Sequence, residues 1–231
     1  MNKLREALDR SEPTMAVVFT GAESDELIDD VAALGAVAEL RVDLLADQTP
    51  DNLKAQITRL AKLPVLLTIR IMPEGGQWQG SMNKRLGLFK SLIPYVDGVD
   101  VEKLSKIAPL VADEAHSQDK VVIGSRHNFV ATPSTPELER LVKIARRIGA
   151  DYTKIAATAN ADDDYDVLKN FTSSQDNLII VAMGDYGPRS RIELPCLGSR
   201  LTYASSGQAV VPGQMNYRQT HEQLIDYAKL F

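Results

Sequence analysis

The stretch "VAELRVDLLAD" (residues 37–47) combines the apolar composition of a buried strand with charges at every second position. Successive side chains of a strand point to opposite faces, so Glu39, Arg41 and Asp43 are expected to share one face. The apolar Val37 and Leu45 continue the same row. The sequence therefore predicts a strand whose core-facing side carries three charges, which an ordinary apolar core does not explain.

Seven further apolar, β-branched runs resemble this one in length and composition. They are "TMAVVFTG" (14–21), "VLLTIRI" (65–71), "GVDVE" (98–102), "KVVIGSRHNF" (120–129), "DYTKIAAT" (151–158), "LIIVAMG" (178–184) and "LTYASSG" (201–207). Segments with helical periodicity lie between them, such as "ESDELIDDVAALG" (23–35) and "STPELERLVKIARRIGA" (134–150). In the second segment, apolar residues recur at helical spacing from Leu138 to Ile148. Pro136 and Glu137 indicate its start and Gly149 its end.

Eight strands that alternate with helices at a spacing of about thirty residues predict an α/β protein, a (β/α)8 TIM barrel. We expect one domain over residues 1–231, with residues 1–13 as a short polar lead-in to the first strand. A doubly wound sheet is the alternative. That fold would need a glycine-rich first turn, which "FTGAESDE" (19–26) does not supply.

The composition limits the kinds of partner. With 44% hydrophobic residues among 231, the chain can form a full core. A net charge of -5 and a pI near 5.3 argue against nucleic-acid or anionic-membrane partners. No apolar run reaches membrane-spanning length. The single Cys196 rules out an internal disulfide, and "MNKLREALDR" (1–10) lacks the apolar core of a signal peptide, so we expect a cytoplasmic protein.

Other predicted strands also carry polar or charged residues among apolar ones, and these residues lie near the carboxyl ends of the strands. Barrel enzymes have their catalytic groups at these ends. These positions are Thr68, Arg70, Asp100, Glu102, Ser125, His127 and Lys154, and the following loops add Glu74, Arg191 and Gln214. Unpaired buried charges cost several kcal/mol, whereas charges that compensate one another around a polar ligand do not. We therefore expect a polar site at this end of the barrel.

Simpler explanations exist for the individual residues. Glu39, Arg41 and Asp43 can form a structural ion network. His127 can be a core histidine with its hydrogen bonds satisfied, and Lys154 can form a salt bridge at the rim. No two histidines have metal-ligand spacing, and the one cysteine is isolated, so no metal site is expected.

Taken together, these residues suit imine chemistry. An uncharged lysine amine attacks a ketone to give an imine, which acts as an electron sink when a neighbouring proton is removed. A histidine can move that proton, a carboxylate can orient the histidine, and arginines can hold an anionic substrate. The residues alone thus predict a Schiff-base lyase or a class I aldolase that acts on a small polyhydroxy acid. A non-catalytic scaffold would be expected to lack the lysine or the histidine, and both are present.

Six motifs then occur in a familiar order and spacing. "ELRVDLL" (39–45), "TIR" (68–70) followed by "EGG" (74–76), "HNF" (127–129) followed by "TP" (132–133), "TKIA" (153–156), "MGDYGPRSR" (183–191) and "PGQ" (212–214) resemble the type I 3-dehydroquinate dehydratases of the shikimate pathway. The resemblance covers nearly the whole chain. It implies a (β/α)8 barrel, usually a homodimer, that converts 3-dehydroquinate to 3-dehydroshikimate without metal or added cofactor, in the biosynthesis of chorismate and aromatic amino acids.

The resemblance also implies roles for individual residues. Lys154 matches the imine-forming lysine, His127 the general acid/base, and Glu74 the carboxylate that pairs with the histidine. The matched substrate-binding residues are Glu39, Arg41 and Arg70 on the hydroxyl side, Arg191 and Gln214 at the carboxylate end, and Phe129 and Met183 as apolar walls. Asp43 is expected to support the site without touching substrate. Two positions depart from the family pattern: Val210 replaces a frequent serine, and Val181 replaces a methionine.

Overall fold

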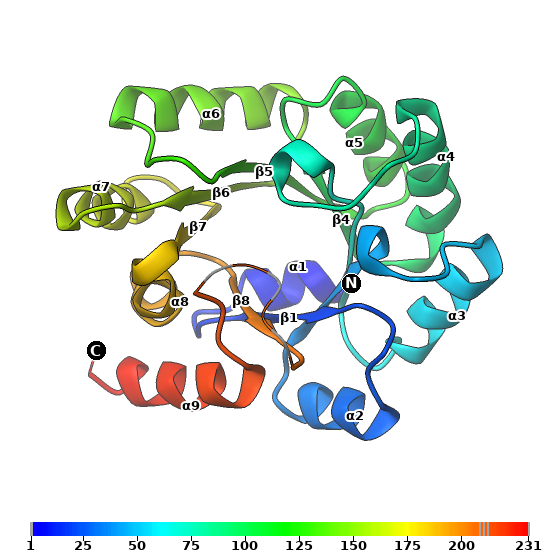
Figure 1. The fold of residues 1–231 in the computed structure, drawn as a ribbon, viewed down its shortest axis with the longest axis horizontal. Coiled ribbons are helices and arrows are strands. Elements are labelled where there is room, and N and C mark those ends of the chain that lie inside the picture. Colours follow the sequence, from blue (N-terminus) through cyan, green and yellow to red (C-terminus); the bar gives the residue numbers. More distant parts are fainter. Residues whose placement is uncertain (1, 208, 210, 212, 231) are drawn as a thin grey trace.

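Eight parallel strands form a barrel in the computed structural model, which describes residues 2–207, 209, 211 and 213–230 (Figure 1). The strands are β1 Met15–Phe19, β2 Val37–Arg41, β3 Val65–Thr68, β4 Gly98–Glu102, β5 Val121–Asn128, β6 Tyr152–Thr158, β7 Leu178–Met183 and β8 Thr202–Ser205. From β1 to β7 each strand pairs with the next in the chain, and β1 also pairs with β8. This order confirms the predicted (β/α)8 barrel and excludes a doubly wound sheet, whose strands are not sequential neighbours.

Helices follow the strands and surround the barrel (Figure 1). The α-helices are α1 Lys3–Leu8, α2 Asp25–Ala33, α3 Pro50–Arg59, α4 Met82–Leu92, α5 Ala108–His116, α6 Thr135–Arg147, α7 Asp162–Thr172, α8 Gly187–Cys196 and α9 Tyr217–Ala228; short 3-10 helices are η1 Val42–Leu44, η2 Met72–Glu74, η3 Ile93–Tyr95 and η4 Gly184–Tyr186. The predicted helix in 134–150 is α6. It begins beside Pro136 and ends before Gly149, which has a positive φ of 83°.

The strands divide the core into an inner and an outer layer. In β2, Val37 belongs to the cluster inside the barrel, whereas Ala38 and Leu40 pack outward against the helices. In β6, Tyr152 and Ala156 face inward and Ile155 faces outward. Because side chains alternate, the inward row of β2 continues from Val37 to Glu39 and Arg41. The charges thus lie inside the barrel, toward the carboxyl ends of the strands.

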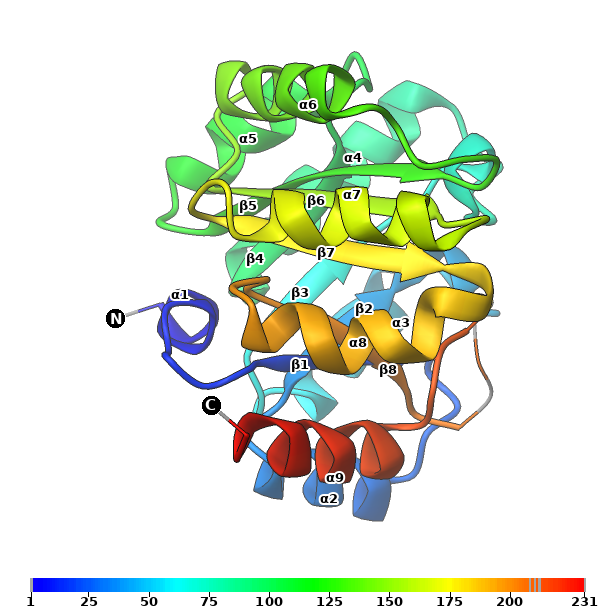
Figure 2. The same cartoon turned by 90° about the vertical axis from the view of Figure 1, so that its left-hand side faces the viewer.

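Residues 1–13 differ from the predicted polar lead-in. Asn2 accepts hydrogen bonds from the amides of Leu4 and Arg5 and so caps α1. Leu4 and Leu8 of this helix are at most 1% exposed and pack into the inner cluster with Ala16 of β1. Figure 2 shows α1 at the amino ends of the strands, where it closes the bottom of the barrel.

The expectation that residues 37–45 form one strand is also wrong. The strand ends at Arg41, and Asp43 lies in η1 instead of on the strand face. The Asp43 carboxylate accepts hydrogen bonds from the backbone amides of Arg70 (3.0 Å) and Gln77 (3.1 Å), which ties the turn to the next loop. As a result the inward row stops, and Leu45 packs in the outer layer.

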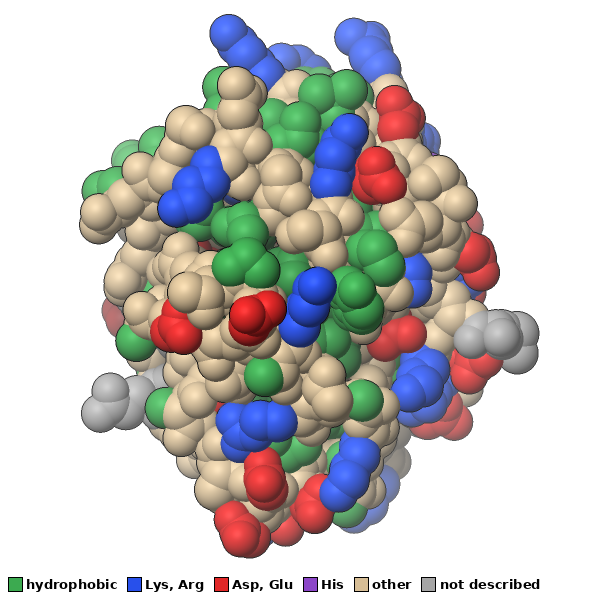
Figure 3. All heavy atoms as spheres, turned by 90° about the vertical axis from the view of Figure 1, so that its right-hand side faces the viewer, with side chains coloured by type: hydrophobic (Ala, Val, Ile, Leu, Met, Phe, Trp, Pro, Cys, Tyr) green, Lys and Arg blue, Asp and Glu red, His purple; other side chains and the backbone are tan. Residues whose placement is uncertain are grey.

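Charges of both signs are scattered over the face that carries α3 and α4, among apolar side chains (Figure 3). This face therefore shows no broad single-sign patch of the kind that steers nucleic acids to a protein. In the described part of the chain, no helix has both the length and the apolar character needed to cross a membrane.

Candidate active site

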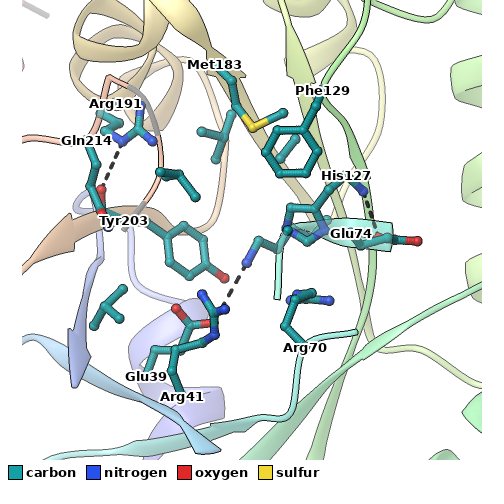
Figure 4. A pocket seen from close by; sticks show the side chains of 16 residues that line it. Glu39, Arg41, Arg70, Glu74, His127, Phe129, Met183, Arg191, Tyr203 and Gln214 are labelled. Atoms are coloured by element: carbon teal, nitrogen blue, oxygen red, sulfur yellow. Dashed lines mark hydrogen bonds and ion pairs between the residues drawn. The ribbon is translucent and has the colours of Figure 1, made fainter. Parts of the chain in front are cut away.

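A pocket opens at the carboxyl ends of the strands, and sixteen side chains line it (Figure 4). All ten residues that the sequence analysis places at the site are among them: Glu39, Arg41, Arg70, Glu74, His127, Phe129, Lys154, Met183, Arg191 and Gln214. Val18, Gly75, Ala156, Val181, Tyr203 and Val211 complete the lining. The structure thus brings together ten predicted residues that lie up to 175 positions apart in the sequence, from Glu39 to Gln214.

Lys154 lies inside the barrel on the inward row of β6. Its Nζ is 3.1 Å from Asp100 Oδ2 and 4.0 Å from Glu39 Oε1. The same nitrogen lies 3.7 Å from the centroid of the Tyr203 ring. Since Lys154 is only 5% exposed, a salt bridge at the rim does not describe it. The amine faces the pocket, where a bound carbonyl compound can reach it.

His127 on β5 and Glu74 in η2 form a pair whose side chains are largely buried. Nδ1 of His127 lies 3.1 Å from Glu74 Oε2, and the backbone amide of His127 donates to the same oxygen at 2.9 Å. Burial, aided by the charges of Arg70 and Lys154, lowers the pKa of His127 well below 6.5. Burial also raises the pKa of Glu74, although a 2.7 Å hydrogen bond from Arg126 opposes this. With Nδ1 held by Glu74, the neutral imidazole presents Nε2 for proton transfer.

Two glycines explain how Glu74 reaches His127. Gly75 follows η2 in the left-handed region, with φ of 80°, where glycine carries no steric penalty. A Cβ atom on Gly76 would lie 2.0 Å from the carbonyl oxygen of Arg70, so only glycine fits there. The "EGG" motif therefore folds the chain tightly back over β3 and directs Glu74 toward β5.

Arg70 connects the floor of the pocket to strands β4 and β5. Its guanidinium lies 2.8 Å from Asp100 and 3.1 Å from Glu102, and it donates to Ser125 Oγ at 2.7 Å. These carboxylates raise the pKa of Arg70 above its ordinary value despite the cost of burial. Glu102 also pairs with Arg85 of α4. This buried network compensates its own charges, which removes the cost that unpaired ions would carry.

Glu39 and Arg41 separate into different environments. Glu39 accepts a hydrogen bond from Thr68 Oγ1 at 2.8 Å and faces Lys154. Arg41 forms a two-pronged ion pair with Asp43, at 3.0 and 2.7 Å. The alternative of a structural ion network therefore describes Arg41 and Asp43. Asp43 does not line the pocket, whereas Arg41 both lines it and is held in place by Asp43.

Arg191 lies in α8, although the sequence analysis expected it in a loop. Its guanidinium donates to the carbonyl oxygens of Gly187 (2.8 Å), Tyr203 (3.1 Å) and Ala182 (3.4 Å). Among the described residues no carboxylate forms an ion pair with it, and burial lowers the pKa of Arg191 to about 10. An anionic group in the pocket would supply that negative partner. Gln214 follows β8 in the connection to α9, as predicted.

The walls of the pocket are apolar. The Phe129 ring stacks on His127 with centroids 6.5 Å apart, and Met183 at the end of β7 also lines the pocket (Figure 4). Val181, the departure from the family methionine, faces the pocket from β7. Val210, the other departure, lies outside the described residues.

Sequence reasoning assigned no role to two residues that the structure places next to Lys154. Asp100 shares the inward parity of β4, which is a readable signal, and its pKa is held below the ordinary value by Arg70 and Lys154 despite burial. Tyr203 looks like an ordinary apolar residue of β8, and only the fold reveals that it faces the lysine. Among the described residues, no group of three His, Cys, Asp or Glu side chains is placed to hold a metal ion.

The geometry defines a class of protein. It is a (β/α)8 barrel in which the buried Lys154 lies near the carboxylates of Glu39 and Asp100. The His127–Glu74 pair lines one side of the pocket, and Arg191, which has no carboxylate partner among the described residues, lines the other. This arrangement is suited to forming an imine with an anionic ketone and to moving a proton beside it.

Comparison with known proteins identifies the family within that class. Residues 15–228 match the family described as Type I 3-dehydroquinase, and this chain belongs to that family. A 3-dehydroquinate dehydratase of Thermodesulfovibrio yellowstonii is 32% identical over 209 residues, covering 89% of this chain and 92% of the relative. One from Methanococcus maripaludis is 36% identical over 196 residues, covering 82% and 87%.

Solved structures agree with this assignment. The crystal structure of 3-dehydroquinate dehydratase from Geobacillus kaustophilus superposes with a TM-score of 0.84 at 25% identity, covering 95% of this chain and 92% of the other. The enzyme from Aquifex aeolicus gives a TM-score of 0.80 at 29% identity, covering 94% and 98%.

Proposed function

We propose that this chain is a 3-dehydroquinate dehydratase that acts through an imine on Lys154. The observation that carries the proposal is the position of Lys154. In a chain of the type I 3-dehydroquinase family, its amine lies in the pocket 3.1 Å from Asp100, beside the His127–Glu74 pair. The product is 3-dehydroshikimate, and the reaction belongs to the shikimate pathway.

The reaction follows from the chemistry of these groups. The Lys154 amine attacks the ketone carbon, the carbonyl oxygen leaves as water, and an imine forms. His127 then takes a proton from the carbon next to the imine carbon. The C–H electron pair forms a C=C bond to the former imine carbon, and the π pair of the C=N bond moves onto nitrogen. The resulting enamine expels the hydroxyl group one carbon further on, and His127 returns the proton so that water leaves. Hydrolysis of the conjugated imine releases the enone and restores Lys154.

The remaining pocket residues hold the substrate. Glu39 and Arg70 lie beside Lys154 and present acceptors and donors for substrate hydroxyl groups. Arg191 and Gln214 approach from α8 and from the segment before α9, on the side away from Glu74 (Figure 4). Arg191 therefore meets the substrate carboxylate while the ketone reaches Lys154. Phe129 and Met183 exclude water from the reacting carbons.

The test is reduction with borohydride in the presence of 3-dehydroquinate, followed by peptide mass spectrometry. We expect a ligand-derived mass on Lys154 and on no other lysine, because this lysine faces the pocket. A Lys154→Met variant is the matched control and should acquire no such mass. A modified peptide elsewhere would falsify the assignment. Near-ultraviolet absorbance distinguishes this enzyme from the alternative, a class I aldolase. The dehydratase product is a conjugated enone that absorbs in this range, whereas an aldolase would give two fragments and no enone.

Two further proposals rest on family membership. We propose that the chain forms a homodimer, which sedimentation analysis tests directly: a monomer at micromolar concentration would contradict it. We also propose a cytoplasmic location. Its support is the chemistry of a pathway enzyme and the single, unpaired Cys196, which has no need of an oxidising compartment.

A further inference from the structure

Tyr203 presents an unexplained polar atom inside the pocket. The residue lies on β8 and is 5% exposed. Its hydroxyl group is buried and has no hydrogen-bond partner among the described residues. Figure 4 shows the ring extending into the middle of the pocket, with the hydroxyl turned toward the side where Glu39 and Arg41 lie. Buried hydroxyl groups nearly always have a hydrogen-bond partner, and the described residues supply none for the Tyr203 hydroxyl, so a bound ligand is a candidate partner.

The ring of Tyr203 also lies against the nucleophile. The Nζ atom of Lys154 is 3.7 Å from the ring centroid, so any carbon bonded to that nitrogen is next to the phenol. We propose that the Tyr203 hydroxyl donates a hydrogen bond to the ketone oxygen of the substrate while Lys154 attacks the ketone carbon. This inference deepens the proposed function and rests on it, because it assigns a second group to the first step of the reaction.

The surroundings of Tyr203 favour a donor at this point. Burial, together with the negative charges of Glu39 and Asp100, raises the pKa of the phenol well above 10. The hydroxyl group therefore keeps its proton at neutral pH. When the amine adds to the ketone, negative charge develops on the oxygen, and a donor already in place stabilises that charge. No proton needs to leave the phenol, so the step requires no other co-reactant.

The test measures how fast the imine forms in a Tyr203→Phe variant. Enzyme and 3-dehydroquinate are mixed, the reaction is stopped with borohydride after successive short times, and the adduct on Lys154 is quantified by mass spectrometry. We expect adduct formation at least about 10-fold slower than in the unmodified chain, as for the loss of one hydrogen bond to a developing charge. Adduct formation at the unmodified rate would overturn the inference.

A matched control removes a hydroxyl elsewhere. Tyr217 lies on α9 outside the pocket lining, with its hydroxyl 3.4 Å from Asp30, and Tyr217→Phe should form the adduct at the unmodified rate. Thermal unfolding should show Tyr203→Phe to be at least as stable as the unmodified chain, because the described residues form no hydrogen bond with the Tyr203 hydroxyl that the variant would lose. If the unmodified chain itself formed no adduct, the proposed function would fail. Equal rates of adduct formation in the unmodified chain and in Tyr203→Phe would instead overturn only the role of Tyr203.

A second measurement leaves residue 203 unchanged. In Lys154→Met the ketone of 3-dehydroquinate stays intact, and Tyr203 is the one tyrosine among the described residues of the pocket lining. A hydrogen bond from its phenol should shift the tyrosine absorption band to longer wavelength when the substrate binds. Binding without any such shift would overturn the inference.

Discussion

At the scale of single residues, burial decides which form of a titratable side chain the site contains. Histidine is the side chain whose ordinary pKa lies nearest neutrality. At His127, burial and neighbouring cations lower the pKa well below 6.5. The imidazole is therefore neutral, as a base must be before it takes a proton. The sequence indicates that His127 shares a strand face with Ser125, yet it says nothing of how deeply the ring is buried.

Lys103 is buried like Lys154, but it has no role in the proposed reaction. It follows β4, is 2% exposed, and its amine has no hydrogen-bond partner in the described part of the chain. Burial lowers its pKa to about 7, although Glu74 and Asp100 act in the opposite direction. The unfolded chain, with a lysine pKa near 10.4, therefore binds a proton that the folded chain does not hold above pH 7.

This difference predicts a stability that depends on pH. Stability should rise as the pH increases from 7 toward 10, because the unfolded state binds more protons in that window. At pH 6 the amine is charged in both states and its full penalty, a few kcal/mol, remains. A Lys103→Met variant should thus be more stable than the unmodified chain by about 2–5 kcal/mol at pH 6, and by clearly less at pH 9. Urea unfolding at the two pH values measures this.

The control for this prediction is Lys106→Met, an exposed lysine in the same connection. Its effect should lie within about 0.5 kcal/mol of zero at both pH values, as for ordinary surface changes. Equal gains from Lys103→Met at pH 6 and pH 9 would show that lost packing strain, and not the ionisation of the amine, limits stability.

At the scale of elements, alternation explains what could be predicted. A strand has only two faces, so the parity of Glu39, Arg70, His127 and Lys154 was enough to place them in one pocket once the barrel was recognised. The exact end of a strand has no such rule. Asp43 leaves the row because its carboxylate binds two amides of a distant loop, and no local pattern contains that partner.

The same reasoning explains why α1 was missed. Six residues are too few to establish a helical pattern, and an isolated helix of that length is unstable in water. The helix exists because it covers the bottom of the barrel. A Cβ atom on Gly98 of β4 would lie 2.5 Å from Leu4, which shows how closely the two approach. Its stability is therefore a tertiary property that appears only when the eight strands have closed.

A substitution in α1 should separate stability from activity. Leu4 is fully buried in the inner cluster, so Leu4→Ala should lower the free energy of unfolding by about 2–5 kcal/mol. Because α1 lies at the end of the barrel opposite the pocket, kcat and KM should stay unchanged below the unfolding temperature. Denaturant titration and steady-state kinetics on the same preparation test both statements. The exposed Glu6 of the same helix provides the control, since Glu6→Ala should alter neither. A Leu4→Ala enzyme with a raised KM would mean that the bottom of the barrel sets the shape of the pocket.

At the scale of the whole molecule, the barrel has one seam. The hydrogen-bonded order of strands runs from β7 back through β1 to β8, so β7 and β8 are its two ends. Other hydrogen bonds join them. The backbone amide of Arg200 donates to Leu178 at 2.8 Å, and the Ser199 hydroxyl accepts from the amide of Ile180 at 2.9 Å. Nearer the pocket, Arg191 reaches from α8 to carbonyl oxygens of Ala182 and Tyr203, one on each strand.

Arg191 thus links β7 and β8, and in the proposed function it also holds the substrate carboxylate. A conservative change should weaken both. Lysine keeps the charge but not the planar fork of donors, so it cannot hold both strands and a carboxylate together. Arg191→Lys should raise KM for 3-dehydroquinate by about 10-fold or more, the loss of one charge-assisted hydrogen bond, with a smaller effect on kcat.

Hydrogen exchange in Arg191→Lys should also become faster at the amides of β7 and β8, while β4 and β5 keep the protection of the unmodified chain. Arg189 is the matched site, because it lies on the same helix, is exposed, and pairs with Glu193 outside the pocket lining. Arg189→Lys should change neither quantity. An Arg191→Lys enzyme with normal KM would show that the substrate carboxylate is held elsewhere. A raised KM with unchanged hydrogen exchange would show that Arg191 binds substrate but does not hold β7 and β8 together. Ser199 and the backbone hydrogen bonds would then hold these two strands.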